Sequence, residues 1–449
     1  MHCFGGTLGP LFIGLIILFG GCELDSVLRY ETAEALASQR FGEDDRMRVN
    51  ISPGRVADVE ELDSTFNVAA VSSGPFPTIT FNNGTTSSQS LTLTLGNVNS
   101  AWTFSPLLNA LPSSERKAPD CATDALETRA SISLATSVPS TVLGTTVRIE
   151  LELPPCAQVQ LHAQPAPASA LVRIAIIGGL EGDRSFLSAA VVHAADLGVD
   201  YVQFLGNVAF LADDTVFGEF ETTVQGQGLP YGVIVAPDDT FAPSDFVQRF
   251  GGSDYVTEIG QMRWIALDTA SGELTDEQLA IVTGLEERRP PGIFLSSIAL
   301  LDFGTTEGLR STALGARLVE ELASRGVLLA LNSGGPEHTQ RQFGEVGFRD
   351  LAGASAEPAS IAIVEFRRPW PNLTSCTTSV DCSGNDICDR GFCRSRCAAD
   401  TECDAGEGCS AGICSLTCSA DADCAGPLPS CGAGFCEQDP EIALTLSRL

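Results

Sequence analysis

Basic residues are scarce in this sequence of 449 residues, and lysine is almost missing. Aspartate and glutamate number 57 against 26 lysines and arginines, and Lys117 is the single lysine. The formal net charge of −31 offers no basic field that could displace counterions from nucleic-acid phosphates. We therefore expect no nucleic-acid partner. The apolar share of 44% excludes a mostly disordered chain.

Histidine is the second shortage, with only His2, His162, His193 and His338 in the whole chain. The sequence contains no G-x-S-x-G elbow, P-loop or H-E-x-x-H motif, and a serine triad built on His338 would lack a marked nucleophile. Carboxylates are so plentiful that the sequence does not single out a catalytic pair. The sequence therefore assigns no catalytic residue.

A long hydrophobic run is missing as well. The apolar stretch 8–19 is shorter than the about 20 residues that span a bilayer, which indicates a signal peptide over residues 1–21. The small residues before Cys22 resemble the lipobox of bacterial lipoproteins, and an ordinary cleaved signal is the alternative. The resemblance implies an exported lipoprotein anchored in a membrane through Cys22, in the periplasm or on the outer cell surface.

Cysteine, in contrast, is abundant near the C-terminus. Residues 376–436 contain the unit C-x5-C-x5-C-x4-C three times, with few apolar residues between the cysteines. Covalent cross-links must hold such a segment, and zinc sites favour closer C-x2–4-C pairs, so we predict disulfides with the pairing left open. The spacing resembles cysteine-rich repeats of bacterial surface lipoproteins, which implies a stalk or contact module. The cysteines are Cys376, Cys382, Cys388, Cys393, Cys397, Cys403, Cys409, Cys414, Cys418, Cys424, Cys431 and Cys436.

The first half of the mature chain contains two segments that differ in composition and hydrophobic pattern. Residues 22–62 are polar and acidic and are predicted to form a tether. Residues 63–168 contain short alternating segments, such as 90–95 and 145–153, separated by turn residues, which predicts a small β-sandwich. A disulfide between Cys121 and Cys156 would cross-link this domain.

Residues 169–370 contain short, uniformly apolar runs alternating with helical stretches. Such runs are typical of strands buried on both faces, so a layered α/β domain is expected. The segment Thr275-Asp276-Glu277-Gln278 is a capping box that should open a helix. Residues 437–449 are predicted to be a C-terminal tail.

The order of segments in this α/β region resembles the calcineurin-like metallophosphoesterase superfamily. The similarity is carried by the strand 172–177 with the glycines after it, by 200–207, by 230–239, by 262–269 and by 327–341. In that family these segments contain the motifs D-x-H, G-D, G-N-H-[DE] and G-H-x-H and one further histidine. The resemblance implies a scaffold on which two metal ions activate water and bind a phosphoryl group.

The ligands implied by the family are replaced in this sequence. The D-x-H pair corresponds to Gly179 and Glu181, and the aspartate of G-D corresponds to Asn207. The other replacements are Pro237 and Asp238 in G-N-H-[DE], Ser296 or Ser297 for the lone histidine, and Gly334-Gly335-Pro336-Glu337 for G-H-x-H, with His338 one place late. Glycine and proline have no side-chain donor, whereas Asp239 keeps its family identity. His193 lies in a helical stretch away from the strand ends.

These replacements lead to two hypotheses. The first is a cell-envelope lipoprotein with a catalytically inactive metallophosphoesterase-like domain, no cofactor, and envelope proteins or glycans as partners. The second is an active phosphoester hydrolase with a rebuilt site for divalent metal ions, for which an all-oxygen set would suit Ca²⁺ or Mg²⁺. The candidate ligands for that site are Glu181, Asn207, Asp238, Asp239, Glu337 and His338.

Overall fold

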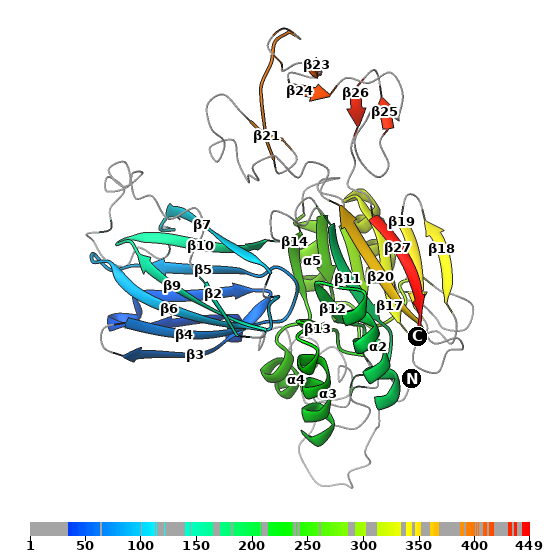
Figure 1. Ribbon diagram of the computed structural model, residues 1–449, viewed down its shortest axis with the longest axis horizontal. Coiled ribbons are helices and arrows are strands. Elements are labelled where there is room, and N and C mark those ends of the chain that lie inside the picture. The colour runs from blue at the N-terminus through cyan, green and yellow to red at the C-terminus, as the bar shows by residue number, and fades with distance from the viewer. Residues whose placement is uncertain are drawn as a thin grey trace, which may run out of the picture.

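The computed structural model describes three bodies, the third of which is inserted in the chain between two strands of the second (Figure 1). The described residues are 35–62, 65–99, 101–112, 114, 121, 140–143, 145–164, 171–180, 183–206, 208, 214–236, 239, 243–259, 262–285, 292–301, 312–333, 338–343, 346–351, 360–367, 387–389, 392–399, 401, 403, 407–410, 413–416, 430–432, 435–437 and 442–449. The predicted signal peptide and Cys22 lie outside these residues.

The first body is the expected β-sandwich, formed by two five-stranded sheets. One sheet has the order β1 (Ser38–Phe41), β2 (Met47–Ser52), β5 (Thr78–Asn83), β10 (Ala157–Gln164) and β7 (Thr103–Ala110). The other has the order β3 (Gly54–Leu62), β4 (Thr65–Ser72), β6 (Gln89–Gly96), β9 (Thr146–Leu153) and β8 (Ser140–Leu143). Alternate apolar residues of both sheets face inward and form the core.

The sandwich begins earlier than the sequence suggested. Residues 38–62, assigned above to an acidic tether, contain β1, the 3-10 turn Glu43–Asp45, β2 and β3. The acidic composition misled the prediction because Asp58, Glu60 and Glu61 are exposed on β3, whereas Val49 and Ile51 of β2 are buried in the core.

The second body is a four-layered α/β/β/α domain, which confirms the expected layered architecture. Its first sheet has the order β13 (Tyr231–Val233), β12 (Tyr201–Phe204), β11 (Leu171–Ile177), β20 (Ser360–Arg367) and β27 (Ile442–Arg448). Its second sheet has the order β14 (Tyr255–Ile259), β15 (Met262–Ala266), β16 (Gly292–Ser296), β17 (Val327–Ser333), β19 (Val346–Leu351) and β18 (Thr339–Phe343).

Helices cover the outer faces of both sheets. The first sheet packs against α2 (Arg184–Asp196), α3 (Asp214–Gly226) and α4 (Pro243–Phe250) through one apolar cluster. The second sheet packs against α5 (Asp276–Thr283) and α6 (Ala313–Ser324) through another. The capping box of α5 is confirmed, because Thr275 Oγ1 accepts from the Gln278 amide and Gln278 Oε1 accepts from the Thr275 amide.

The third body is the cysteine-rich module, which forms three short hairpins. They pair β21 (Ile387–Asp389) with β22 (Phe392–Arg394), β23 (Glu407–Ser410) with β24 (Ile413–Leu416), and β25 (Ser430–Gly432) with β26 (Phe435–Glu437). In each hairpin the third and fourth cysteines of the repeat stand opposite each other, as Cys409 and Cys414 do. The three repeats therefore share one hairpin register.

The chain does not end in the predicted tail. Residues 442–448 form β27, which pairs antiparallel with β20 in the first α/β sheet. The cysteine-rich module is therefore an insertion between two adjacent strands rather than a terminal stalk. Because β20 runs antiparallel to β11, the insertion leaves the sheet at the end opposite the carboxyl end of β11 (Figure 1).

The sandwich docks against one side of the α/β domain, where β13 and β14 are the edge strands of the two sheets. Asn97 Nδ2 donates to the Tyr231 carbonyl at 2.5 Å and Asn97 Oδ1 accepts from the Tyr231 amide at 2.8 Å, as a neighbouring strand would. Thr257 Oγ1 of β14 donates to the Phe76 carbonyl, and Trp102 stacks on Tyr201. One continuous apolar core thus joins the sandwich to the space between the two sheets.

Within the part of the chain that the structure describes, no helix is both long enough and apolar enough to cross a membrane.

Candidate functional site

The candidate site lies where the carboxyl ends of the two α/β sheets meet. Strands β11, β12 and β13 are mutually parallel, and β15, β16, β17 and β19 are mutually parallel. The loops after these strands converge, since the Gly179 amide after β11 donates to Ser333 Oγ at the end of β17 at 2.7 Å. This edge is where ligands bind in layered α/β folds.

The segment after β11 brings no side-chain donor into this edge among its described residues. Gly178 and Gly179 have no side chain, and Leu180, only 2% exposed, packs into the apolar cluster under α2 and α3. The hydroxyl of Ser333 is used by the Gly179 amide. Gly179, at the first motif position, is thus hydrogen-bonded to the residue that precedes the last motif, and this bond joins the two sheets.

Asp239 is the one aspartate that matches the family, and it is buried in a turn after β13. Its Oδ2 accepts from the Ala236 amide at 2.9 Å, and its own amide donates to the Ala236 carbonyl at 3.0 Å. A carboxylate that caps its own turn in this way stabilises the loop.

His338 precedes β18 and is half-buried. Its Nε2 lies 2.6 Å from the hydroxyl of Ser360, the first residue of β20. Burial lowers the pKa of His338, because desolvation disfavours the charged imidazolium. The imidazole therefore ties the β18 edge of one sheet to the β20 end of the other.

The positions that correspond to the lone family histidine carry buried serines. Ser296 Oγ donates to the Ile298 carbonyl at 2.9 Å, and Ser297 Oγ lies 3.2 Å from Thr269 Oγ1. Thr269 Oγ1 also accepts from the Ile298 amide. These hydroxyls connect the ends of β15 and β16.

Two buried polar clusters at the same edge escaped the sequence reasoning. The Asp268 amide donates to Asp254 Oδ1, and Gln278 Nε2 donates to Asp254 Oδ1 and to the Asp268 carbonyl. Asn332 Nδ2 donates to Asp350 Oδ1 at 2.7 Å between β17 and β19. The only sequence signal for them was a polar residue at the end of a strand or in a capping box, which structural roles produce equally well.

A pair of catalytic metal ions stands about 3.5–4 Å apart and needs several anionic or imidazole donors that converge on it. Among the described residues at this edge, the donors are serine and threonine hydroxyls, His338 and the carboxylates of Asp239, Asp254, Asp268 and Asp350, and the contacts given above are internal hydrogen bonds. Among these described residues, no three carboxylate or imidazole groups lie close enough together to hold one metal ion, so they do not by themselves form a dinuclear centre. The other candidates, Glu181, Asn207, Asp238 and Glu337, lie outside the described residues.

His193 lies in α2, as expected, and its Nε2 is 2.8 Å from Ser447 Oγ of β27. The helix thereby helps to hold the C-terminal strand on the sheet.

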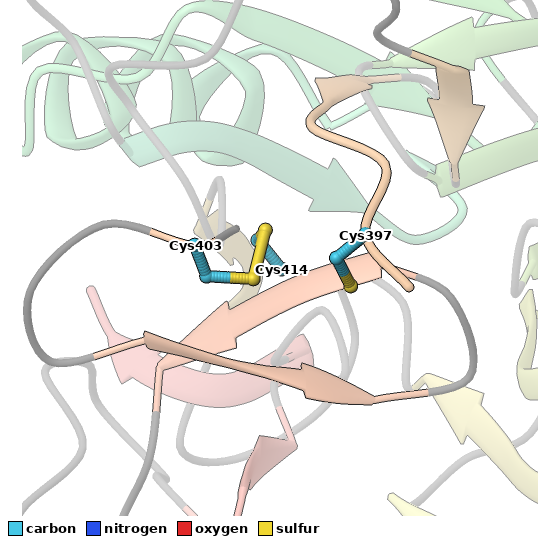
Figure 2. A group of neighbouring side chains, drawn as sticks. All are labelled: Cys397, Cys403 and Cys414. Carbon is cyan, nitrogen blue, oxygen red and sulfur yellow. A yellow bond between two sulfur atoms is a disulfide. The ribbon is translucent and has the colours of Figure 1, made fainter. Parts of the chain in front are cut away.

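Disulfides are confirmed both in the sandwich and in the cysteine-rich module. Cys121 is bonded to Cys156, and in the second repeat Cys397 is bonded to Cys409 and Cys403 to Cys414. Figure 2 shows the sulfur atoms of Cys397, Cys403 and Cys414, which lie within 4.8 Å of one another. A zinc site needs thiolates, whereas these sulfurs are engaged in disulfides. Such bonds indicate an exported protein.

No known protein family and no curated protein sequence matches the chain. Among solved structures, purple acid phosphatase PPD1 from yellow lupin is similar at 11% identity and a TM-score of 0.36, covering 70% of each chain. A dimetal phosphatase from Danio rerio has 10% identity and a TM-score of 0.34, covering 44% of this chain and 95% of its own. GAP50, the anchor in the inner membrane complex of Plasmodium, has 11% identity and a TM-score of 0.34, covering 43% and 81%.

Proposed function

We propose that this chain is a cell-envelope lipoprotein whose metallophosphoesterase-like domain serves as a binding or structural scaffold rather than as a catalyst. The hydrogen bond between the Gly179 amide and Ser333 Oγ carries most of this proposal. It directly joins two strand ends that, in the family, supply ligands to the metal pair. Gly179 and Ser333 thus stabilise the junction of the two sheets through a hydrogen bond. A metal-dependent hydrolase would need charged metal ligands at this place.

The remaining described positions support the same proposal. Asp239 stabilises its own turn, His338 binds Ser360, and Ser297 bonds to Thr269. Each contact is internal to the scaffold and engages a polar atom at the edge where the sheets meet. The net charge of −31 favours solubility and repulsion from anionic membrane surfaces, which suits a protein held beside a membrane.

A phosphodiesterase assay tests the loss of catalysis. The full disulfide-bonded chain is incubated with bis(p-nitrophenyl) phosphate in the presence of Mn²⁺, Zn²⁺, Mg²⁺ or Ca²⁺. We expect no turnover above the metal-only blank. Turnover that is abolished in Asp239→Asn, which keeps an oxygen for the Ala236 amide but removes the negative charge, would instead establish the alternative, an active hydrolase with a rebuilt metal site.

The lipid anchor has its own test. Because the sandwich begins at Ser38, the chain from Cys22 to the first strand has at most 16 residues and reaches at most about 55 Å. We expect the wild-type chain to enter the detergent phase of a Triton X-114 extraction and Cys22→Ser to stay in the aqueous phase. Equal partitioning of the two would contradict lipidation at Cys22.

A further inference from the structure

The outer face of the β1-β2-β5-β10-β7 sheet has an unusual composition for this chain. The residues of these strands that alternate with the buried core positions point away from the core, and none of them is aspartate or glutamate. Amides and hydroxyls predominate instead, and the charged side chains among these residues are Arg40 and Arg48. We call this surface the amide face; its central residues are Asn50, Thr78, Thr80, Asn82, Asn109, Gln158, Gln160 and His162.

The lack of carboxylates distinguishes this sheet from the opposite sheet of the sandwich. The chain has 57 acidic residues in 449, or one in about eight. The outer face of the opposite sheet follows the general composition, with Glu60 on β3 and Glu150 and Glu152 on β9, all exposed. One side of the sandwich is thus acidic, whereas the other carries no negative side chain on its strands.

Strand register gathers the amides into a compact array. Asn82 on β5 lies between Arg48 on β2 and Gln158 on β10, and Thr80 lies between Asn50 and Gln160. The strands of a sheet are about 4.8 Å apart, so these side chains are near neighbours. The array spans four adjacent strands (Figure 1).

Hydrogen bonds between the amides hold the array in place. Gln158 Nε2 donates to Asn82 Oδ1 at 3.0 Å, and Asn109 Nδ2 donates to Gln160 Oε1 at 3.2 Å. Each amide has two N–H donors and an oxygen with two lone pairs, so one or two such bonds leave capacity for a ligand. Side chains already fixed in one rotamer lose less entropy when they bind.

We propose that the amide face binds a neutral polysaccharide. A sugar hydroxyl both donates and accepts a hydrogen bond, and amides offer both functions on one side chain. A protein partner would favour buried aromatic anchors, but the outward residues of β2, β5, β7 and β10 include only one aliphatic side chain, Leu107, and no phenylalanine, tyrosine or tryptophan. With no carboxylates on these strands, Arg40 and Arg48 are their charged side chains, and both can donate hydrogen bonds to the hydroxyls of an uncharged sugar chain.

This interaction belongs to the sandwich and does not depend on the proposed inactivity of the α/β domain. A polymer can contact several such proteins on one membrane, so modest affinity per chain suffices for retention. Binding would hold the envelope protein against a glycan layer.

Affinity electrophoresis of the full disulfide-bonded chain tests the proposal. Native gels contain dextran, yeast mannan or barley β-glucan, and a gel without polysaccharide gives the reference mobility. We expect retardation by at least one neutral polymer. In Gln158→Ala/Gln160→Ala the affinity should fall about tenfold, because each lost hydrogen bond to a neutral partner weakens binding about two- to tenfold.

The matched control is Ser90→Ala/Thr94→Ala, which removes two hydroxyls from exposed positions on β6 of the opposite sheet. This variant should be retarded like the wild type, and circular dichroism should show that both variants are folded. Raising the salt from about 0.05 to 0.5 M should leave the retardation unchanged, since a neutral polymer offers no charge to Arg40 or Arg48. Absence of retardation in all three gels, equal retardation of the amide variant, or loss of binding in high salt would each overturn the proposal.

Discussion

The contact of Asn97 with Tyr231 gives the sharpest test of how the sandwich is attached. Tyr231 lies on the open edge of β13, and the side-chain amide of Asn97 pairs with both its backbone N–H and its backbone carbonyl. Asn97 Nδ2 also donates to the Ser72 carbonyl at 2.7 Å. Tyr231 and Ser72 are buried. Asn97 has φ of 59°, a left-handed conformation that asparagine and glycine tolerate. Asn97→Gly therefore removes the amide without adding backbone strain.

We expect Asn97→Gly to lower the free energy of unfolding by about 2–4 kcal/mol. A buried backbone group that loses its partner costs about 1–3 kcal/mol, and water that enters beside the half-buried Asn97 recovers part of the loss. Asn97→Ala should cost about 1 kcal/mol more, because alanine resists the left-handed conformation.

Urea unfolding of the disulfide-bonded chain, followed by tryptophan fluorescence, measures this change. Trp102 stacks on Tyr201 at the same interface, so its emission reports directly on the attachment. Asn109→Ala is the control, because Asn109 donates to the side chains of Gln158 and Gln160 on the outer sheet face, and its loss should change stability by no more than about 0.5 kcal/mol. A loss below about 0.5 kcal/mol in Asn97→Gly would refute the reasoning.

Three further outcomes are expected. Trp102→Ala should lower the free energy of unfolding by about 3–5 kcal/mol in urea titrations, since it opens a cavity in the core shared by both domains. The pKa of His338 is lowered in the folded state, so below the ordinary histidine pKa of about 6.5 the unfolded state binds more protons than the folded state. The melting temperature should therefore fall as the pH drops through about 6.5, and it should fall less steeply in His338→Gln. Peptide mapping should show that the first and third repeats have the disulfide pairing of the second repeat, in which the first cysteine bonds to the third and the second to the fourth. Any other pairing would contradict the hairpin register that the three repeats share. The expected bonds are Cys376–Cys388, Cys382–Cys393, Cys418–Cys431 and Cys424–Cys436.

Local patterns predicted much of the fold. The alternation in 90–95 and 145–153 corresponds to β6 and β9, and the capping box begins α5. Strand β27 has the same alternation but was assigned to a tail, because its partner β20 lies more than 70 residues earlier and local sequence contains no signal of that pairing. The acidic residues of β3 hid a strand for a different reason, since Asp58, Glu60 and Glu61 lie in its second half, which is largely exposed on both faces beyond the buried Val56.

The candidate site was less predictable. The sequence showed that the ligands of the family are replaced. It did not show which hydrogen bonds the remaining polar side chains form. The bonds of Ser333 to Gly179 and of His338 to Ser360 join residues from different sheets or distant strands. Their geometry arises only when the two sheets pack face to face, which residue spacing along one strand does not encode.

Metal content tests the central claim most directly. The purified disulfide-bonded chain is incubated with excess Mn²⁺ and Zn²⁺, passed through a gel-filtration column and analysed by inductively coupled plasma mass spectrometry. A scaffold whose strand ends bond to each other should retain far less than one ion per chain. Two ions per chain, removable by a chelator and lost in Asp239→Asn, would contradict the account, because they would place a dinuclear centre at the edge where Gly179 and Ser333 meet.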